Sequence, residues 1–235
     1  MKQMMIASTS TVHGSGYLSY LLETLTSFFK DADTILFIPY ARPGGISHDE
    51  YTEKAKEAFI QIGKHVKGIH EFDNPKDALN QAKGIFVGGG NTFVLVNQLY
   101  KNDLISALQE VIRSGTPYLG TSAGSNICGL TINTTNDMPI VYPPSFKTLG
   151  MVPFNINPHY LDPDPTSKHM GETRETRIQE FHAYNTPPVV GLREGSWLEV
   201  NGDNIILKGE VDARIFEYNK SAYEVKTGTD LSRLK

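Results

Sequence analysis

The sequence predicts an α/β fold in which a mostly parallel sheet is flanked by helices on both faces. In the first half of the chain, short apolar runs of strand length alternate with segments whose apolar residues recur at helical spacing. Parallel strands need such helical crossovers, whereas antiparallel strands can be joined by short turns. From residue 189 onward short strands are separated by tight turns, so we expect an antiparallel meander at the C-terminal end of the sheet.

The expected parallel strands are short apolar runs bounded by turn residues or by helical segments. Such runs are typical of strands that are covered on both faces. They comprise residues 4–9, 34–40, 67–72, 84–93, where the strand runs into a glycine turn, and 116–120.

The segments between these runs are the expected helices. They comprise residues 17–30, 48–63, 74–82 and 94–115. Gly63 ends the second helix. Asn74 is a good N-cap for the third helix, and Pro75 suits its first position. The fourth helical segment is expected to break near Asn102 and Asp103.

The second half of the chain has a different character. Residues 131–150 contain turn residues throughout and predict a long functional loop. Residues 151–162 predict a strand that leads into a polar, proline-rich loop, and 171–185 predict a helix. Residues 189–219 predict the short antiparallel strands, with the sequence NGD at a hairpin turn.

Composition indicates one soluble globular domain over residues 1–235. The chain has 235 residues, of which 39% are hydrophobic, and a formal net charge of −4. Its basic residues are scattered, which argues against nucleic acid as a partner. Cys128 is the single cysteine, and neither a signal peptide nor an apolar run long enough for a membrane span is present. We therefore expect a cytoplasmic protein, either a monomer or a homodimer.

The segment GTSAGSN, residues 120–126, carries the most informative short motif. Gly120, Ser122 and Gly124 fit the nucleophile-elbow pattern, in which flanking glycines let a strand and a helix approach closely while the serine is held out over the sheet. A serine that caps a helix at a tight turn is the alternative interpretation.

A serine nucleophile also needs backbone N–H groups that point at the developing oxyanion. Gly89 and Gly90, at the end of the strand that begins at residue 84, can supply such groups, and so can Ala123 next to the serine. A phosphate cradle is the alternative for the glycine run, but the run lacks the lysine of a P-loop.

The best candidate for the general base is His159, which follows an apolar strand and the extended dipeptide Asn157-Pro158. Its orienting carboxylate is not determined by spacing, and both Glu194 and Asp137 lie in turns or loops. His13, His48 and His169 also lie in loops and are possible supporting groups.

Read together, these motifs resemble the peptidase E family of aspartyl dipeptidases, over almost the whole chain. The segments that carry the resemblance follow the family's order: IFVGGGNTF, GTSAGSN, TTNDMPIV, INPHY, KHMGETRETRI and GLREGSW. The resemblance implies a fold similar to class I glutamine amidotransferases and a serine exopeptidase that needs no metal or cofactor. It implies Ser122 as nucleophile, His159 as base and Glu194 as orienting acid, with Asp137 in a supporting or substrate-binding role.

The resemblance also implies a substrate: a small peptide with an N-terminal aspartate. Arg174 is the implied partner of the aspartate side chain, because a guanidinium matches a carboxylate with two parallel hydrogen bonds. No acidic residue stands three or four positions after Arg174, whereas Arg177 has Glu180 within reach. Asn91 and Asp137 are both candidates for holding the substrate's free amino group.

Two other functions remain as alternatives. A cyanophycinase-like peptidase of the same family would share the elbow, although such enzymes typically have longer chains. A non-catalytic binding protein on the same scaffold would not need serine, histidine and glutamate together. A glutamine amidotransferase is disfavoured because it requires cysteine at the elbow, where this chain has Ser122.

Overall fold

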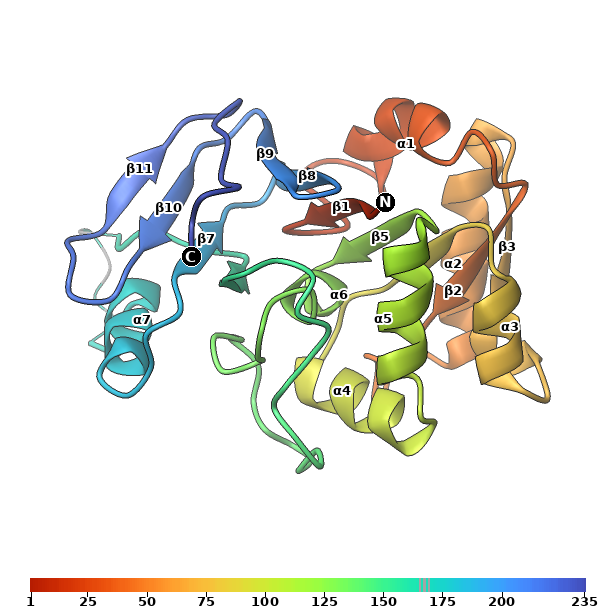
Figure 1. Ribbon diagram of the computed structural model, residues 1–235, viewed down its shortest axis with the longest axis horizontal. Coiled ribbons are helices and arrows are strands. Elements are labelled where there is room, and N and C mark those ends of the chain that lie inside the picture. Colours follow the sequence, from red (N-terminus) through yellow and green to blue (C-terminus); the bar gives the residue numbers. More distant parts are fainter. Residues whose placement is uncertain (165, 167, 169) are drawn as a thin grey trace.

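A seven-stranded sheet forms the larger part of the molecule (Figure 1). The computed structural model describes residues 1–235 except 165, 167 and 169. The strand order is β3-β2-β4-β5-β1-β8-β9; the first five are parallel, and β8 and β9 are antiparallel additions. The strands are β1 (Gln3–Ala7), β2 (Thr34–Ile38), β3 (His65–Gly68), β4 (Ile85–Val87), β5 (Tyr118–Thr121), β8 (Ser196–Asn201) and β9 (Asn204–Gly209).

Helices cover both faces of this sheet, as predicted. Alternate residues of β1 show the division: Met4 and Ile6 pack with the cluster that includes α4 and α5, while Met5 and Ala7 pack with the cluster that includes α1 and α2. The helices are α1 (Leu22–Phe28), α2 (His48–Phe59), α3 (Pro75–Gln81), α4 (Thr92–Lys101), α5 (Ile105–Ser114) and α6 (Ala123–Asn126), with short 3-10 turns η1 (Ser19–Leu21), η2 (Ile60–Ile62) and η3 (Ile69–Glu71).

A second sheet of four strands lies beside the first, with α7 (Arg174–His182) packed near it (Figure 1). Its order is β11-β10-β7-β6. Its strands are β6 (Asn155–Pro158), β7 (Val189–Leu192), β10 (Ala213–Phe216) and β11 (Tyr223–Val225). The expected C-terminal meander is therefore divided: β8 and β9 extend the main sheet, whereas β10 and β11 pair beside β7, which itself runs parallel to β6.

Local sequence signals explain most element boundaries. Asn74 caps α3 by accepting hydrogen bonds from the N–H groups of Lys76 and Asp77. Asp103 has a φ of 53°, which breaks the predicted long helix into α4 and α5. Gly63, with a φ of 69°, ends the turn after α2.

Two predicted elements differ in extent from those observed. The strand expected over 67–72 spans His65–Gly68 and is followed by a 3-10 turn, because the Glu71 side chain accepts from the Gly68 N–H and bends the chain. The strand expected over 151–162 is limited to Asn155–Pro158, since the turn at 152–154 precedes it and His159 leaves the extended region.

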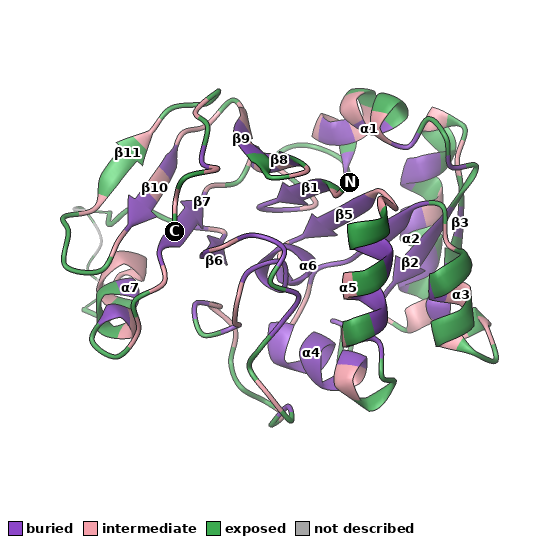
Figure 2. Cartoon of the chain, in the orientation of Figure 1, coloured by how far each residue is buried: buried purple, intermediate pink, exposed green. Residues whose placement is uncertain are grey.

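One hydrophobic cluster spans both sheets. It includes Met4 and Ile6 of β1 together with Ile156 of β6 and Val190 of β7, all fully buried. Figure 2 shows the central strands of the main sheet as almost wholly buried. The C-terminal segment adds Leu231, whose N–H donates to the carbonyl of Ile205. The two sheets consequently share a core, and the carboxyl ends of β4, β5, β6 and β7 are brought to one region.

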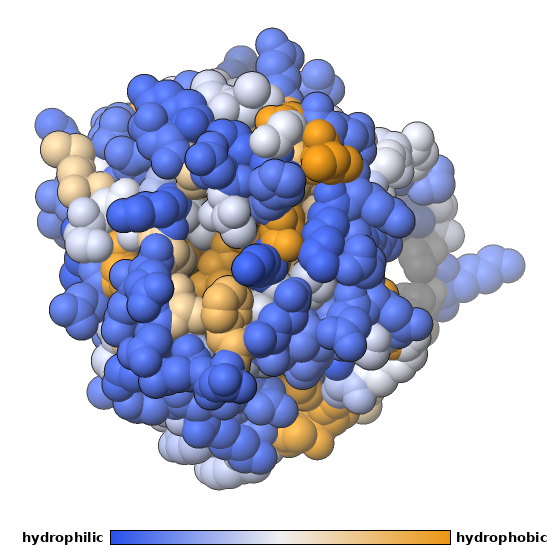
Figure 3. Space-filling model, turned by 90° about the vertical axis from the view of Figure 1, so that its right-hand side faces the viewer, coloured by the Kyte–Doolittle hydropathy of each residue, from blue (hydrophilic) through white to orange (hydrophobic). Residues whose placement is uncertain are grey.

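The far edge of the main sheet, at β3, lies away from that region. Figure 3 shows this face, where hydrophilic side chains surround a few hydrophobic ones. A shallow cavity of about 640 Å³ lies here between α2 and β3, lined by Ile60, Val66 and several lysines. Among the described residues, no helix is long and apolar enough to cross a membrane.

Cys128 provides a test of the packing behind the elbow. Its side chain is fully buried and its thiol donates to the carbonyl of Gly124, and burial raises the pKa of the thiol to about 12. Since the thiolate is the reactive form, we expect a thiol reagent such as Ellman's reagent to leave the native protein unmodified at pH 8. One thiol should react when the protein is unfolded in guanidinium chloride. Rapid stoichiometric modification of the native protein would contradict this packing.

Candidate active site

The segment around Ser122 is a sharp turn between β5 and α6. Ser122 has φ 55° and ψ −111° and makes no capping hydrogen bond to α6, in contrast to the N-cap alternative. A Cβ on Gly124 would lie 2.2 Å from the carbonyl oxygen of Val87, and one on Gly120 would lie 2.4 Å from that of Gly124. Only glycine at both positions lets α6 approach β4 and β5 this closely.

Ser122 is joined to His159 and Glu194 by hydrogen bonds. The Ser122 Oγ lies 2.8 Å from Nε2 of His159, and Nδ1 of the same ring lies 2.6 Å from Oε1 of Glu194. The arrangement suits the tautomer in which Nδ1–H donates to the carboxylate and Nε2 accepts from the serine hydroxyl. The His159 and Glu194 side chains are 34% and 41% exposed, so a ligand can reach the group from solvent.

His159 is held in position by its backbone. Its φ is 55°, and its N–H donates to the Oγ of Ser8 at 2.9 Å. The Ser8 hydroxyl in turn donates to the carbonyl of Leu192 at 2.7 Å, two residues before Glu194. Ser8 thus links β1 to the ends of β6 and β7. Sequence reasoning missed it, although its place directly after an apolar strand was the available signal.

The glycine turn after β4 lies against the serine. A Cβ on Gly89 would lie 2.8 Å from the Cβ of Ser122, and Gly90, at φ 144°, would bring a Cβ within 2.3 Å of the Ala41 carbonyl oxygen. Among the residues that the structure describes, the N–H groups of Gly89 and Gly90 donate to no acceptor. Ala123 is the first residue of α6, where a backbone N–H has no intrahelical partner. These donors are available for an anionic oxygen near Ser122.

Asn91 and Asp137 both stabilise the start of α4. Asn91 accepts from the N–H of Val94 at 3.1 Å and donates to the carbonyl of Met138 at 2.9 Å, so both ends of its amide are occupied. Oδ2 of Asp137 accepts from the N–H of Thr92 at 2.7 Å, which favours a carboxylate at a helix N-terminus. Asp137 is not hydrogen-bonded to His159, whereas Glu194 is.

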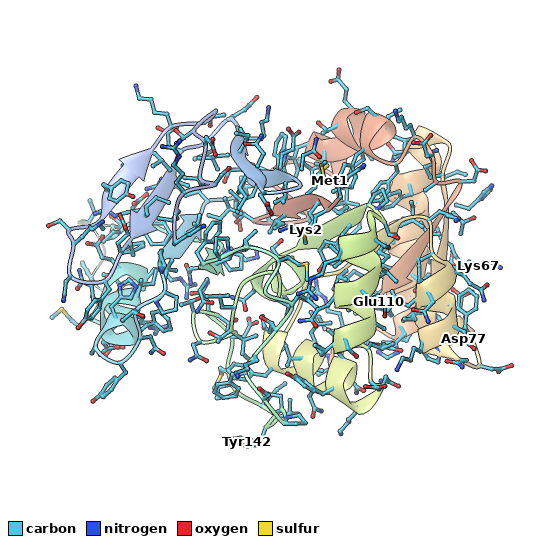
Figure 4. All side chains as sticks on the ribbon, in the orientation of Figure 1. Met1, Lys2, Lys67, Asp77, Glu110 and Tyr142 are labelled. Carbon is cyan, nitrogen blue, oxygen red and sulfur yellow. The ribbon has the colours of Figure 1, made fainter. Side chains whose placement is uncertain are left out.

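The loop that contains Asp137 is pinned to β6. Asn157 of β6 donates from its side chain to the carbonyl of Thr134 and to the side chain of Asn136, and Asn136 donates to the carbonyl of Pro158. Farther along the loop the chain projects away from the sheets, and Tyr142 stands out into solvent there (Figure 4). The base of the loop is therefore held next to His159 while its tip is exposed.

Arg174 is the first residue of α7. Its side chain has no ion pair or hydrogen bond within the described part of the chain. Its half-buried side chain lines a cavity of about 400 Å³ together with Arg177 and the segment 161–164 that follows His159. Burial, and then the neighbouring Arg177, lower the pKa of Arg174, while Asp137 acts in the opposite direction. Arg177 pairs with Glu172 at 3.8 Å rather than with Glu180.

The other histidines expected in loops are not part of this group, and His48 is the first residue of α2 rather than a loop residue. His48 packs against His70 with ring centroids 5.3 Å apart, and His13 is exposed. His169 lies outside the described residues. Within the described ranges, no cluster of three or more histidine, cysteine, aspartate or glutamate side chains could hold a metal ion.

An α/β sheet with a hydrogen-bonded serine, histidine and carboxylate at its strand ends is typical of serine hydrolases. Comparison with known proteins agrees with this class. The profile of peptidase family S51 matches residues 4–208, and the chain belongs to peptidase family S51.

Curated relatives cover the chain almost end to end. A peptidase E of Streptomyces coelicolor is 50% identical over 98% of this chain and 94% of its own length. A probable alpha-aspartyl dipeptidase of Drosophila melanogaster is 45% identical over 99% of this chain and 97% of its own length.

Solved structures resemble the fold at lower identity. A putative peptidase E protein from Listeria monocytogenes has a TM-score of 0.68 at 23% identity and covers 90% of this chain and 100% of its own. A peptidase from an acI-B1 Actinobacterium has a TM-score of 0.73 at 18% identity and covers 98% of this chain and 96% of its own. Both support the α/β fold with two sheets described above.

Proposed function

We propose that this protein is a serine exopeptidase that removes the N-terminal aspartate of Asp-X dipeptides through a Ser-His-Glu triad. The observation that carries the proposal is the hydrogen-bonded chain from Ser122 through His159 to Glu194. It lies at an elbow beside the N–H groups of Gly89, Gly90 and Ala123, which have no acceptor among the described residues. The names of the relatives, peptidase E and probable alpha-aspartyl dipeptidase, support the choice of substrate.

In this mechanism His159 takes the proton of the Ser122 hydroxyl as the oxygen attacks the carbonyl carbon of the aspartyl residue. Glu194 holds the ring in the useful tautomer and stabilises the imidazolium that forms. The N–H groups of Gly89 or Gly90 and of Ala123 donate to the oxyanion, each contributing roughly 3–4 kcal/mol in comparable sites. His159 then protonates the leaving amine, and water hydrolyses the aspartyl-enzyme.

Arg174 is the proposed partner of the substrate's aspartate side chain. Arg177, Arg193 and Arg214 are ion-paired with carboxylates of the protein. Arg174 is unpaired among the described residues and lines a cavity next to the segment that follows His159. A guanidinium already shielded from water gains most from a ligand that supplies the missing carboxylate.

Asp137 is the better candidate for binding the substrate's free amino group. Its Oδ2 serves the start of α4, but its Oδ1 accepts no hydrogen bond from the described residues. Asn91, by contrast, already uses both ends of its amide. A free carboxylate oxygen is a suitable acceptor for an ammonium group.

The first test is the substrate range and its dependence on Ser122. We expect the wild-type protein to hydrolyse Asp-Leu much faster than Glu-Leu, Asn-Leu or acetyl-Asp-Leu, without loss of activity in EDTA. Ser122→Ala should abolish turnover because the attacking oxygen is gone, whereas Ser27→Ala, at an exposed serine of α1, should leave it unchanged. A folded Ser122→Ala protein with near wild-type turnover would exclude the triad, as judged by peptide release measured alongside a thermal melt.

The second test separates the two carboxylates. Glu194→Gln should lower kcat by roughly 10³–10⁴-fold, because the histidine loses the partner that selects its tautomer. Asp137→Asn keeps an acceptor for the Thr92 N–H but loses the charge, so we expect mainly a higher KM for Asp-Leu. Steady-state kinetics over a range of substrate concentrations measure both kcat and KM. If Asp137→Asn has the larger effect on kcat, the assignment of the acid is wrong.

The third test concerns Arg174. Arg174→Met should cost about 2–5 kcal/mol of kcat/KM for Asp-Leu, because a desolvated carboxylate loses its partner. The kcat/KM for Asn-Leu should change far less, so the ratio of kcat/KM for Asp-Leu to that for Asn-Leu should decrease. Arg177→Met serves as the matched control, since Arg177 is exposed and pairs with Glu172. If the ratio narrows for Arg177→Met and not for Arg174→Met, the carboxylate site lies at Arg177.

A further inference from the structure

A network of five ion-paired side chains lies directly beside the proposed triad. Its members come from separate segments of the chain and are Asp162, Glu175, Arg193, Arg214 and Glu224. Three of them are sequence neighbours of the site: Arg193 precedes Glu194, Glu175 follows Arg174, and Asp162 stands three residues after His159. The mechanism proposed above uses none of the five.

Arg193 is the centre of the network, and all of its donors are used. Its Nε and Nη2 donate to the two carboxylate oxygens of Asp162 at 2.9 and 2.7 Å. Its Nη1 and Nη2 donate to the two oxygens of Glu224 at 2.8 and 3.0 Å, and Nη1 also donates to the carbonyl of Asp212. The Arg193 side chain is 15% exposed, whereas its partners Asp162 and Glu224 are 54% and 44% exposed.

The Arg193 guanidinium also stacks on Tyr160, 5.4 Å from the ring centroid. Tyr160 is buried and directly follows His159. Arg193 therefore contacts two residues of the segment that leaves His159, while its own backbone leads into Glu194. No lysine could make both the stack and two bidentate pairs.

Glu224 joins this arrangement to a second arginine. One of its oxygens accepts from Nη2 of Arg193 and from Nη1 of Arg214, the latter at 3.0 Å. Hydrogen bonds from Arg193 first, and from Arg214 as well, lower the pKa of the Glu224 carboxyl, which keeps it charged. Nε of Arg214 donates to Glu175 of α7 at 3.0 Å.

We propose that this network is a positioning device with two arms, one for the catalytic pair and one for the specificity residue. The Arg193 arm holds the His159 segment against the turn that carries Glu194. The Arg214 arm holds α7 through Glu175 and thereby sets the direction of Arg174. The proposal rests on the proposed function, since it assigns positioning roles around those three residues.

The first arm is needed because His159 is in the left-handed backbone region, with a φ of 55°. A non-glycine residue stays there only when its surroundings hold it. Ser8 holds the His159 N–H on one side, and Arg193 holds Tyr160 and Asp162 on the other. Loss of Arg193 lets the ring and Glu194 move apart, and a misplacement of about 1 Å costs roughly 100-fold in rate.

The second arm follows from helix geometry. Successive residues of an α-helix are about 100° apart around its axis. Once Glu175 is fixed toward Arg214, the direction in which Arg174 leaves α7 is fixed as well. Loss of Arg214 should therefore weaken recognition of the substrate carboxylate and leave the triad intact.

The experiment compares Arg193→Met and Arg214→Met, with Lys220→Met as matched control. Lys220 forms an exposed ion pair with Glu217 in the same part of the chain, so its loss should not affect kinetics. We expect Arg193→Met to lower kcat by about 100-fold for both Asp-Leu and Asn-Leu, with little change in KM. We expect Arg214→Met to raise KM for Asp-Leu about tenfold and to narrow the Asp/Asn ratio, with kcat for Asn-Leu unchanged.

A spectroscopic measurement tests the Arg193 arm without any substrate. The Nδ1 proton shared by His159 and Glu194 should give a low-field proton NMR resonance, which Arg193→Met should broaden or remove and Arg214→Met should leave in place. If Arg193→Met does not fold, Asp162→Asn removes one bidentate pair only and should lower kcat about fivefold. If the wild-type protein does not hydrolyse Asp-Leu, the proposed function is wrong. The effect of Arg193→Met on the Nδ1 proton resonance still tests the positioning role of Arg193.

A network that served stability alone would give another result. Both arginine variants would then lower the melting temperature equally, while kcat, KM and the resonance measured well below that temperature would match the control. That outcome would overturn the proposal.

Discussion

The backbone at the end of β5 can turn directly into α6 only because the residues in contact there are glycines, which carry no Cβ between the helix and the strands. Gly124 lies against the carbonyl of Val87, and Gly89 lies against Ser122. The Ser125 hydroxyl lies within hydrogen-bond distance of the carbonyl oxygens of Ala7 and Gly120, at 2.6 and 2.8 Å, and holds the turn in place. The rest of the site depends on this close packing of α6 against the strands. The packing raises Ser122 above the sheet, beside the N–H groups of Gly89, Gly90 and Ala123, which have no acceptor among the described residues.

Charge around the site is divided in a simple way. Arg193 and Arg214 are each ion-paired with two carboxylates of the protein, whereas the Arg174 side chain has no partner among the described residues. A saturated arginine is a structural element, since a ligand would have to displace a bound carboxylate to reach it. An unpaired and half-buried arginine has unmet hydrogen-bonding capacity, which a substrate can fill. The proposed selectivity for an acidic substrate therefore depends on the absence of an acidic partner for Arg174 among the described residues.

Sequence alone was sufficient for the parts of the structure that depend on local pattern. The parallel strands, the helices on both faces, the Asn74 cap and the break near Asp103 follow from periodicity and capping preferences. The elbow and the strand end at His159 also follow, since glycine spacing and the Asn-Pro dipeptide act within a few residues.

Other features depend on which segments become neighbours, and no local pattern encodes that. Strands β7 to β10 are predicted as one meander, yet they divide between two sheets, because alternation of apolar residues determines the buried face and not the partner strand. Ser8 is separated from His159 by 151 positions, and Asp162 from Arg193 by 31. Likewise, the choice between Glu194 and Asp137 required the direction of the His159 ring.

The two halves of the proposed triad belong to different sheets: Ser122 follows a strand of the main sheet, whereas His159 and Glu194 follow strands of the smaller one. The 2.8 Å between the Ser122 Oγ and Nε2 of His159 therefore depends on how the two sheets are packed against each other. If heat or denaturant loosens the hydrophobic cluster shared by the two sheets, Ser122 and His159 separate even while the strands within each sheet stay hydrogen-bonded. We therefore expect the geometry of the proposed triad to be lost before the secondary structure.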